Sequence, residues 1–319
     1  MIRYFALFFI FFVSAQSMAA SLFYSGQFAF NSIDLNTGVE SALNTSTRPD
    51  KLLYANGDLI YRTFNGGAEA GLRSYNIASG VDRLLTNKRA PDTYLYANGS
   101  LYYQDQSGLF SFDLASGVES MLTRPTSAVS SLAYGDGSLF YSDFNGLSSY
   151  NLASGATSIL NSSISGIYAS TFANGQLFYD DITGLNSYDL ATGVSNLLAS
   201  PDGGTGAYGL IYGNGSLFYQ DYDGLHQYNL FSGINNLLIN PGNQVNDLVY
   251  GDGNLFYSDF NGIHGYSLSS GQDTILSTQS ASALAYANIS AVPLPAAFWL
   301  FATGLVGLIG IAKRKQVSK

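Results

Sequence analysis

The sequence predicts an all-β protein: a seven-bladed β-propeller of four-stranded antiparallel blades, closed by strands from both chain ends and followed by one C-terminal transmembrane helix. Three observations predict this fold: a sequence motif that recurs about every 38 residues, incomplete repeats at both ends, and a composition with 35 Gly, 24 Tyr and only 11% charged residues. Such a composition favours short strands and tight turns. The predicted boundaries are a signal peptide at 1–19, the propeller at 20–291 and a C-terminal signal at 292–319.

The repeat is marked by a glycine that closes the phrase L-x-S/T-G or a variant of it. Successive marker glycines are separated by 42, 37, 38, 38, 40 and 38 residues. This period is that of a propeller blade with four strands. The marker glycines are Gly38, Gly80, Gly117, Gly155, Gly193, Gly233 and Gly271.

Each unit contains four apolar runs that turn signals separate. Residues 139–155, "LFYSDFNGLSSYNLASG", hold the second and third runs with the turns that follow them. The first two runs of a unit are joined by Asn-Gly or Asp-Gly, the pairs typical of a type I′ hairpin turn. Six such pairs are present, at Asn56-Gly57, Asn98-Gly99, Asp136-Gly137, Asn174-Gly175, Asn214-Gly215 and Asp252-Gly253.

The incomplete repeats at the two ends complement each other. The first unit begins at its second strand, "LFYSG" at 22–26, and the last consists of a first strand only, "LAYAN" at 284–288. Together they complete a seventh blade, and closing the ring in this way removes free sheet edges. An open solenoid is the alternative, but it does not require complementary end units.

The N-terminus has the three parts of a secretory signal peptide. Arg3 supplies positive charge, residues 6–13 form a short apolar run, and Ser17-Met18-Ala19 is a small-x-small cleavage motif. We expect cleavage between Ala19 and Ala20, so that the protein is exported. An uncleaved anchor and a buried helix are the alternatives. The chain has no cysteine, so the folded domain is stabilised without disulfides.

The C-terminus carries an apolar helix and a basic cluster. Residues 296–312 are uncharged and are followed by Lys313, Arg314 and Lys315. A helix of this length spans about 25 Å, slightly less than the hydrocarbon core of about 30 Å. Because basic residues keep their end of a span in the cytoplasm, the preceding domain is expected on the outer side of the inner membrane.

A proline motif precedes that helix: Val292, Pro293, Leu294, Pro295 and Ala296. Together with the helix and the basic cluster it resembles the VPLPA form of the PEP-CTERM sorting signals. The resemblance implies a Gram-negative envelope protein that an exosortase processes near this motif and that then reaches the cell surface or the extracellular matrix. Leu294 stands where the commoner form has Glu, which leaves open which exosortase reads it. A plain tail anchor that is never cut is the alternative.

The second and third strands also resemble the YWTD propeller repeat of lipoprotein-receptor ectodomains. The shared pattern is LFYxD followed by L-x-x-Y-x-L-x-x-G, with Phe-Tyr in place of the family's Tyr-Trp. The resemblance spans each blade loosely and implies the fold but no ligand.

Repeated polar residues are the first candidates for chemistry. One repeat position holds Asp105, Asp143, Asp181, Asp221 and Asp259. A catalytic acid is needed once or twice, whereas an aspartate in every turn is typical of hydrogen bonding to turn amides. Calcium is possible at such loops, although no full calcium motif is present, and we expect neither a metal nor another cofactor.

The two histidines are the remaining candidates. His226 and His264 occupy equivalent positions in neighbouring blades and are weak candidates for ligand contact or acid-base work. Other blades hold Arg73, Phe110, Ser148 and Asn186 there, a variety that predicts a surface or lining position.

Charge is uneven along the propeller. All eight of its Lys and Arg lie between Arg48 and Arg124, whereas residues 125–291 hold twelve Asp and no basic residue. This argues against nucleic acid or an anionic matrix as a ligand of the acidic side, because phosphates need cationic partners. We expect a binding or scaffold propeller without catalysis, whose partners are an exosortase and extracellular polysaccharide or surface proteins. The alternative is an enzyme acting on glycans or lactones at the central channel.

Overall fold

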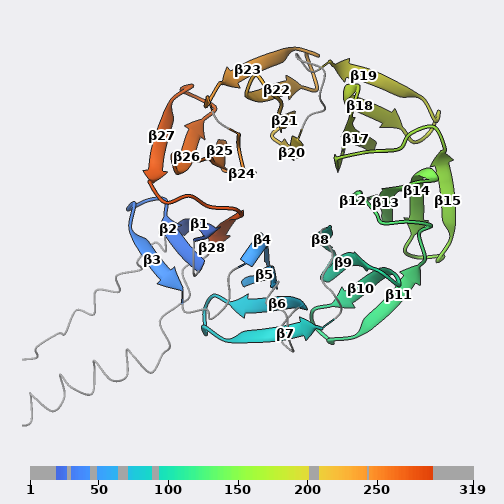
Figure 1. The fold of residues 1–319 in the computed structure, drawn as a ribbon, viewed down its shortest axis with the longest axis horizontal. Coiled ribbons are helices and arrows are strands. Elements are labelled where there is room, and N and C mark those ends of the chain that lie inside the picture. The colour runs from blue at the N-terminus through green and yellow to red at the C-terminus, as the bar shows by residue number, and fades with distance from the viewer. Residues whose placement is uncertain are drawn as a thin grey trace, which may run out of the picture. The chain divides into compact units, whose positions relative to one another are not determined.

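The structure, a computed structural model, describes residues 19–26, 30–43, 49–63, 71–87, 93–200, 208–242 and 244–289. Residues Ser21–Ala287 form one compact unit. Its strands make seven four-stranded sheets arranged as blades of a ring (Figure 1), which confirms the predicted all-β propeller. Within the described residues no helix is long and apolar enough to cross a membrane. The predicted helix at 296–312 lies outside those residues.

The strands follow one another blade by blade. Blade 1 consists of β28 (Leu284–Ile289), β1 (Ala19–Ser25), β2 (Phe30–Asp34) and β3 (Glu40–Leu43). Blade 2 consists of β4 (Pro49–Ala55), β5 (Asp58–Thr63), β6 (Gly71–Asn76) and β7 (Asp82–Thr86). Blade 3 consists of β8 (Tyr94–Ala97), β9 (Ser100–Asp105), β10 (Gly108–Asp113) and β11 (Glu119–Thr123). Blade 4 consists of β12 (Ser131–Gly135), β13 (Ser138–Asp143), β14 (Gly146–Asn151) and β15 (Thr157–Asn161).

The remaining blades repeat this order. Blade 5 consists of β16 (Ala169–Ala173), β17 (Gln176–Asp181), β18 (Gly184–Asp189) and β19 (Ser195–Ala199). Blade 6 consists of β20 (Tyr208–Gly213), β21 (Ser216–Gln220), β22 (Leu225–Asn229) and β23 (Asn235–Ile239). Blade 7 consists of β24 (Asp247–Gly251), β25 (Asn254–Ser258), β26 (Ile263–Ser267) and β27 (Asp273–Ser277).

The turns that join the first two strands of blades 2 to 7 have the predicted geometry. Their Asn or Asp residues have φ angles between 45° and 52°, and the glycines that follow them also have positive φ. Two successive left-handed residues define the type I′ turn, whose twist matches that of the paired strands. The Asn-Gly and Asp-Gly signals therefore identified these hairpins correctly.

The directions of the strands determine on which of the two faces of the ring each connection lies. Since neighbouring strands are antiparallel, the first and third turns of a blade lie on one face. The second turn lies on the other face, together with the crossover that leads into the next blade. We call this second face the crossover face. First strands lie toward the centre of the ring and fourth strands lie at its rim (Figure 1).

The core lies between the blades and is built from the LFY phrase. Its tyrosines are buried: Tyr24, Tyr61, Tyr103, Tyr141, Tyr179, Tyr219 and Tyr257. The preceding aromatic ring stacks on a ring from the first strand of the next blade, as in Phe140–Phe172 and Phe218–Tyr250, whose centroids lie 5.5 and 5.7 Å apart. Each blade thereby covers its neighbour, which a single sheet cannot do for itself.

The two ends of the chain complete blade 1, as the incomplete repeats predicted. Strand β28 lies next to β1, and the Ser25 amide donates to the Ala283 carbonyl at 3.0 Å. The Phe256–Tyr286 stack, at 5.6 Å, joins blade 7 to blade 1 in the way that other neighbouring blades are joined. The ring is thus closed by ordinary blade contacts, so fragment 20–291 contains the whole folding unit.

Candidate functional site

The turns between second and third strands place the recurrent aspartates on the crossover face. In blade 4, Oδ1 of Asp143 accepts from the Asn145 amide at 2.8 Å, and Oδ2 accepts from the Thr126 amide and hydroxyl at 2.9 Å. The aspartates at 105, 181, 221 and 259 also accept from amides of their own turns. The prediction that these carboxylates serve the turns is confirmed.

A glycine ends each of these turns because the rim strand passes close to it. Gly224 has a φ of 135°, and a Cβ there would lie 2.2 Å from the Ile239 carbonyl oxygen. Gly262 has a φ of 144° and meets the Ser277 carbonyl in the same way. The D-x-x-G turn is therefore locked by an aspartate at its start and by backbone packing at its end.

The histidine position corrects the surface alternative predicted for it, because it is buried in five blades and half-buried at Arg73. His226 and His264 are each 6% exposed, and Phe110, Ser148 and Asn186 are also buried at this position. The reason is pairing: His226 stands opposite Tyr219, and the two rings stack at 5.1 Å. The varied residues fill the space between blades in different ways, so variety did not indicate exposure.

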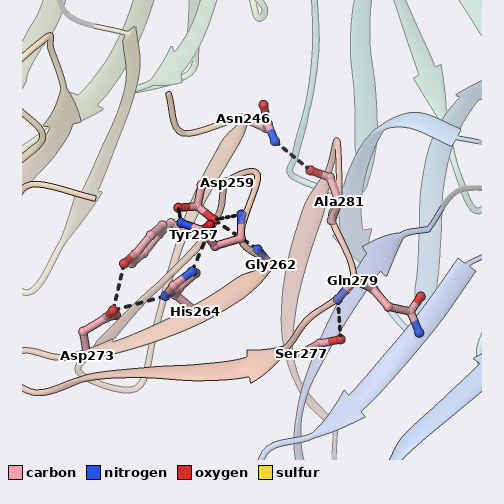
Figure 2. A network of polar contacts seen from close by, with 10 residues as sticks. Asn246, Tyr257, Asp259, Gly262, His264, Asp273, Ser277, Gln279 and Ala281 are labelled. Atoms are coloured by element: carbon pink, nitrogen blue, oxygen red, sulfur yellow. Dashed lines mark hydrogen bonds and ion pairs between the residues drawn. The ribbon is translucent and has the colours of Figure 1, made fainter. Parts of the chain in front are cut away.

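Blade 7 surrounds its histidine with two carboxylates (Figure 2). Nδ1 of His264 lies 3.1 Å from Oδ2 of Asp273, and Nε2 lies 3.3 Å from Oδ1 of Asp259. The Tyr257 hydroxyl donates to Asp273 at 3.0 Å, and its ring stacks on the imidazole at 4.6 Å. Burial and the adjacent Asp273 carboxylate raise the pKa of Tyr257, so the hydroxyl stays protonated as a donor.

In blade 6 only one carboxylate lies beside the histidine. Nε2 of His226 lies 2.8 Å from Oδ1 of Asp221, but Asn235 stands where blade 7 has Asp273. The two histidines thus contact carboxylates of their own blades and do not share one. Within the described ranges, no three His, Asp or Glu side chains are placed to hold a metal ion.

Two aspartates that the sequence did not single out have raised pKa values: the buried Asp180 and the half-buried Asp247. Burial raises the pKa of Asp180 to about 8, with a further contribution from neighbouring Asp181. Burial also raises the pKa of Asp247 to about 6. Asp247 accepts from the Leu284 amide at 2.7 Å and so links blade 7 to the closing strand. The sequence held no clear signal for Asp180, because its repeat position varies and holds Arg62 in blade 2 and Gln220 in blade 6.

A hollow of about 520 Å³ opens on the crossover face of blade 6. It lies between the turn 221–224 and the crossover residues 240–242 and 244, with Tyr222, Asn240 and Gln244 among the lining residues. Gln220 supports the floor: with its amide oriented to satisfy both partners, it donates to the Val245 carbonyl at 3.1 Å and accepts from the Val245 amide at 3.0 Å. Its volume is in the range of small-molecule sites.

The remaining predicted site residues are at the chain ends. Ala19 and Ala20 are the first residues of β1, so cleavage between them would leave Ala20 at the start of that strand. The proline motif and the basic cluster lie outside the described residues: Val292, Pro293, Leu294, Pro295, Ala296, Lys313, Arg314 and Lys315.

Comparisons with known proteins support the fold. No protein-family model and no curated protein sequence matches the chain. Among solved structures, it is similar to a nidogen/laminin complex, with 11% identity over 85% of this chain and 99% of that one and a TM-score of 0.52. It is also similar to the extracellular domain of the one-component system BT4673 from B. thetaiotaomicron, with 17% identity over 77% of this chain and 36% of that one and a TM-score of 0.59.

A designed protein, Ika8, is similar at 14% identity over 74% of this chain and 77% of that one, with a TM-score of 0.54. At identities this low, the likeness to these structures concerns the propeller fold alone.

Proposed function

We propose that this chain is an exported, non-enzymatic propeller that serves as a binding or scaffold module at the cell surface or in the extracellular matrix. The observation that carries the proposal is the use of its repeated polar residues. The turn aspartates and both histidines make hydrogen bonds or ion pairs within their own blades, as building elements do. An extracellular domain among the similar structures supports an exported location.

A capture experiment tests the binding role. Immobilised fragment 20–291 is expected to retain an extracellular polysaccharide or a surface protein from the envelope and matrix fractions, saturably and in competition with free fragment. A heat-unfolded sample serves as the control. Absence of any competed component would contradict the binding role, and turnover of glycan or lactone substrates by the fragment would favour the enzyme alternative.

The proposal includes processing at the C-terminal motif by an exosortase-type enzyme. The resemblance of residues 292–315 to the VPLPA signal supports it. Replacing Pro293 and Pro295 by Ala is expected to leave the protein at full length in the inner membrane, because alanine lets the helix extend through the recognition segment. Immunoblots of membrane and medium fractions measure the length and location.

Pro125→Ala, a change in the propeller, is the matched control for that experiment and should be processed normally. Processing and release of the double variant at the normal rate would show that the motif is not a sorting signal, and would leave the binding role of the propeller standing.

A further inference from the structure

Large apolar side chains stand exposed at one repeat position of four consecutive blades. The position directly follows the turn aspartate, on the crossover face. It holds Phe144, Ile182, Tyr222 and Phe260, which are 87%, 65%, 71% and 73% exposed. We call these four residues the apolar crescent.

The fold does not require apolar residues there. The turn conformation is set by the aspartate that accepts the amides and by the glycine beneath the rim strand. Blade 3 builds the same turn with an exposed Gln106. The core does not need the crescent side chains, and they are the most exposed large apolar residues that the structure describes on the crossover face, which makes them available to a ligand.

The hollow of blade 6 opens beside the middle of the crescent. Tyr222 belongs to both, and the other lining residues include Asn240, Gln244 and Asp221, whose carboxylate is paired with His226. Amide groups bind hydroxyls without charge, while an aromatic ring packs against the C–H face of a pyranose. A volume of about 520 Å³ has room for one or two sugar rings.

The charge of this sector further limits the class of ligand that it can bind. Residues 125–291, which include all four of these blades, contain twelve Asp and no Lys or Arg. An anionic polymer would meet only repulsion on this sector. A neutral chain of linked sugars meets neither repulsion nor the cost of stripping water from a charge.

The spacing of the crescent favours a repeating ligand over a protein. Polar residues interrupt the apolar side chains within each turn, namely Asn145, Thr183, Asp223 and Asn261. The core of a protein interface is a contiguous apolar area. Single apolar side chains presented once per blade, three of them aromatic rings, fit a polymer whose own apolar faces recur.

We propose that the apolar crescent and the adjoining hollow bind a neutral polysaccharide, with crescent side chains packing against sugar rings and the hollow holding one end or branch. This proposal rests on the proposed binding function, and it adds the class of ligand and the face of the ring that binds it. Binding is then independent of salt, because no ion pair takes part.

Affinity electrophoresis of fragment 20–291 tests the proposal. The gels contain hydroxyethyl cellulose, mannan or dextran as neutral probes and alginate as the anionic probe. The wild type is expected to be retarded by at least one neutral polymer and not by alginate. The triple variant Phe144→Ala, Tyr222→Ala, Phe260→Ala should bind about tenfold more weakly, since removing central aromatic anchors costs the most.

Phe231→Ala is the matched control. Phe231 is fully exposed in blade 6, but it lies in the third turn and thus on the opposite face. This variant should bind as the wild type does. Thermal melting verifies that all variants are folded, which is expected because every changed side chain is exposed.

Three outcomes would overturn the glycan proposal: no retardation by any neutral polymer, retardation by alginate alone, or equal retardation of the triple variant. If the wild type still captures a surface protein in the experiment described above, the binding function stands and only the ligand class is wrong. Loss of that protein in the triple variant would reassign the crescent to a protein partner.

Discussion

Removal of residues 282–290 is expected to destabilise the propeller by roughly 5 kcal/mol or more, because it deletes the first strand of blade 1. The deletion removes buried Leu284, three buried alanines and the Tyr286 ring that stacks on Phe256. It also leaves the Asp247 carboxylate without the Leu284 amide. For a domain of this size the midpoint of thermal unfolding should fall by at least about 10 °C.

The control for this experiment is a chain that ends at residue 291, which keeps β28 and should melt as the full propeller does. Tyr286→Ala tests the same closure more mildly, since it removes only the ring and its hydrogen bond to Asp252 at 2.6 Å. Unchanged melting of the deletion variant would mean that the ring does not depend on its composite blade.

Stability is expected to fall as the pH rises from about 4 to about 8, and Asp180 is the main reason. Its pKa is raised by burial from 3.8 to about 8, so the folded state binds the proton more tightly than the unfolded state. The resulting stabilisation is fully present below the unfolded value and is lost as the pH passes through the folded value. Over that interval it amounts to at most about 6 kcal/mol.

Asp180→Asn should remove most of this slope and raise the free energy of unfolding at pH 8, as urea titrations at several pH values will measure. A smaller slope between pH 4 and 6 should persist, because burial raises the pKa of Asp247 to about 6. Asp189→Asn is the control, since Asp189 is only half-buried and turn amides lower its pKa. An unchanged slope in Asp180→Asn would contradict this assignment.

Local signals predicted most of the fold because each acts over a few residues. The Asn-Gly and Asp-Gly pairs predicted their hairpins, and the marker glycines have the left-handed φ angles that their turns require. The turn aspartates were also predicted, because an aspartate accepts from amides two or three residues away. What the sequence analysis got wrong, the exposure of the histidine position, depends on the neighbouring strand and blade.

The candidate site was only partly predictable for the same reason. Sequence spacing placed His226 and His264 in equivalent positions but did not show that each contacts its own blade's aspartate. The exposed Phe144 and the buried Phe140 are only four residues apart in the sequence. Their environments differ because Phe140 lies in strand β13, whereas Phe144 lies in the turn that follows it.

The sequence by itself determined the repeat, the number of blades, the hairpin turns and the pairing of the chain ends, because turn chemistry and periodicity are local properties. Tertiary structure alone decided which polar residues are buried and hydrogen-bonded within the fold and which apolar residues remain exposed to solvent. Burial, stacking between blades and the raised pKa of Asp180 arise only when neighbouring sheets pack together. The exposed crescent residues of blades 4 to 7 likewise come to lie on one face only because the blades close into a ring.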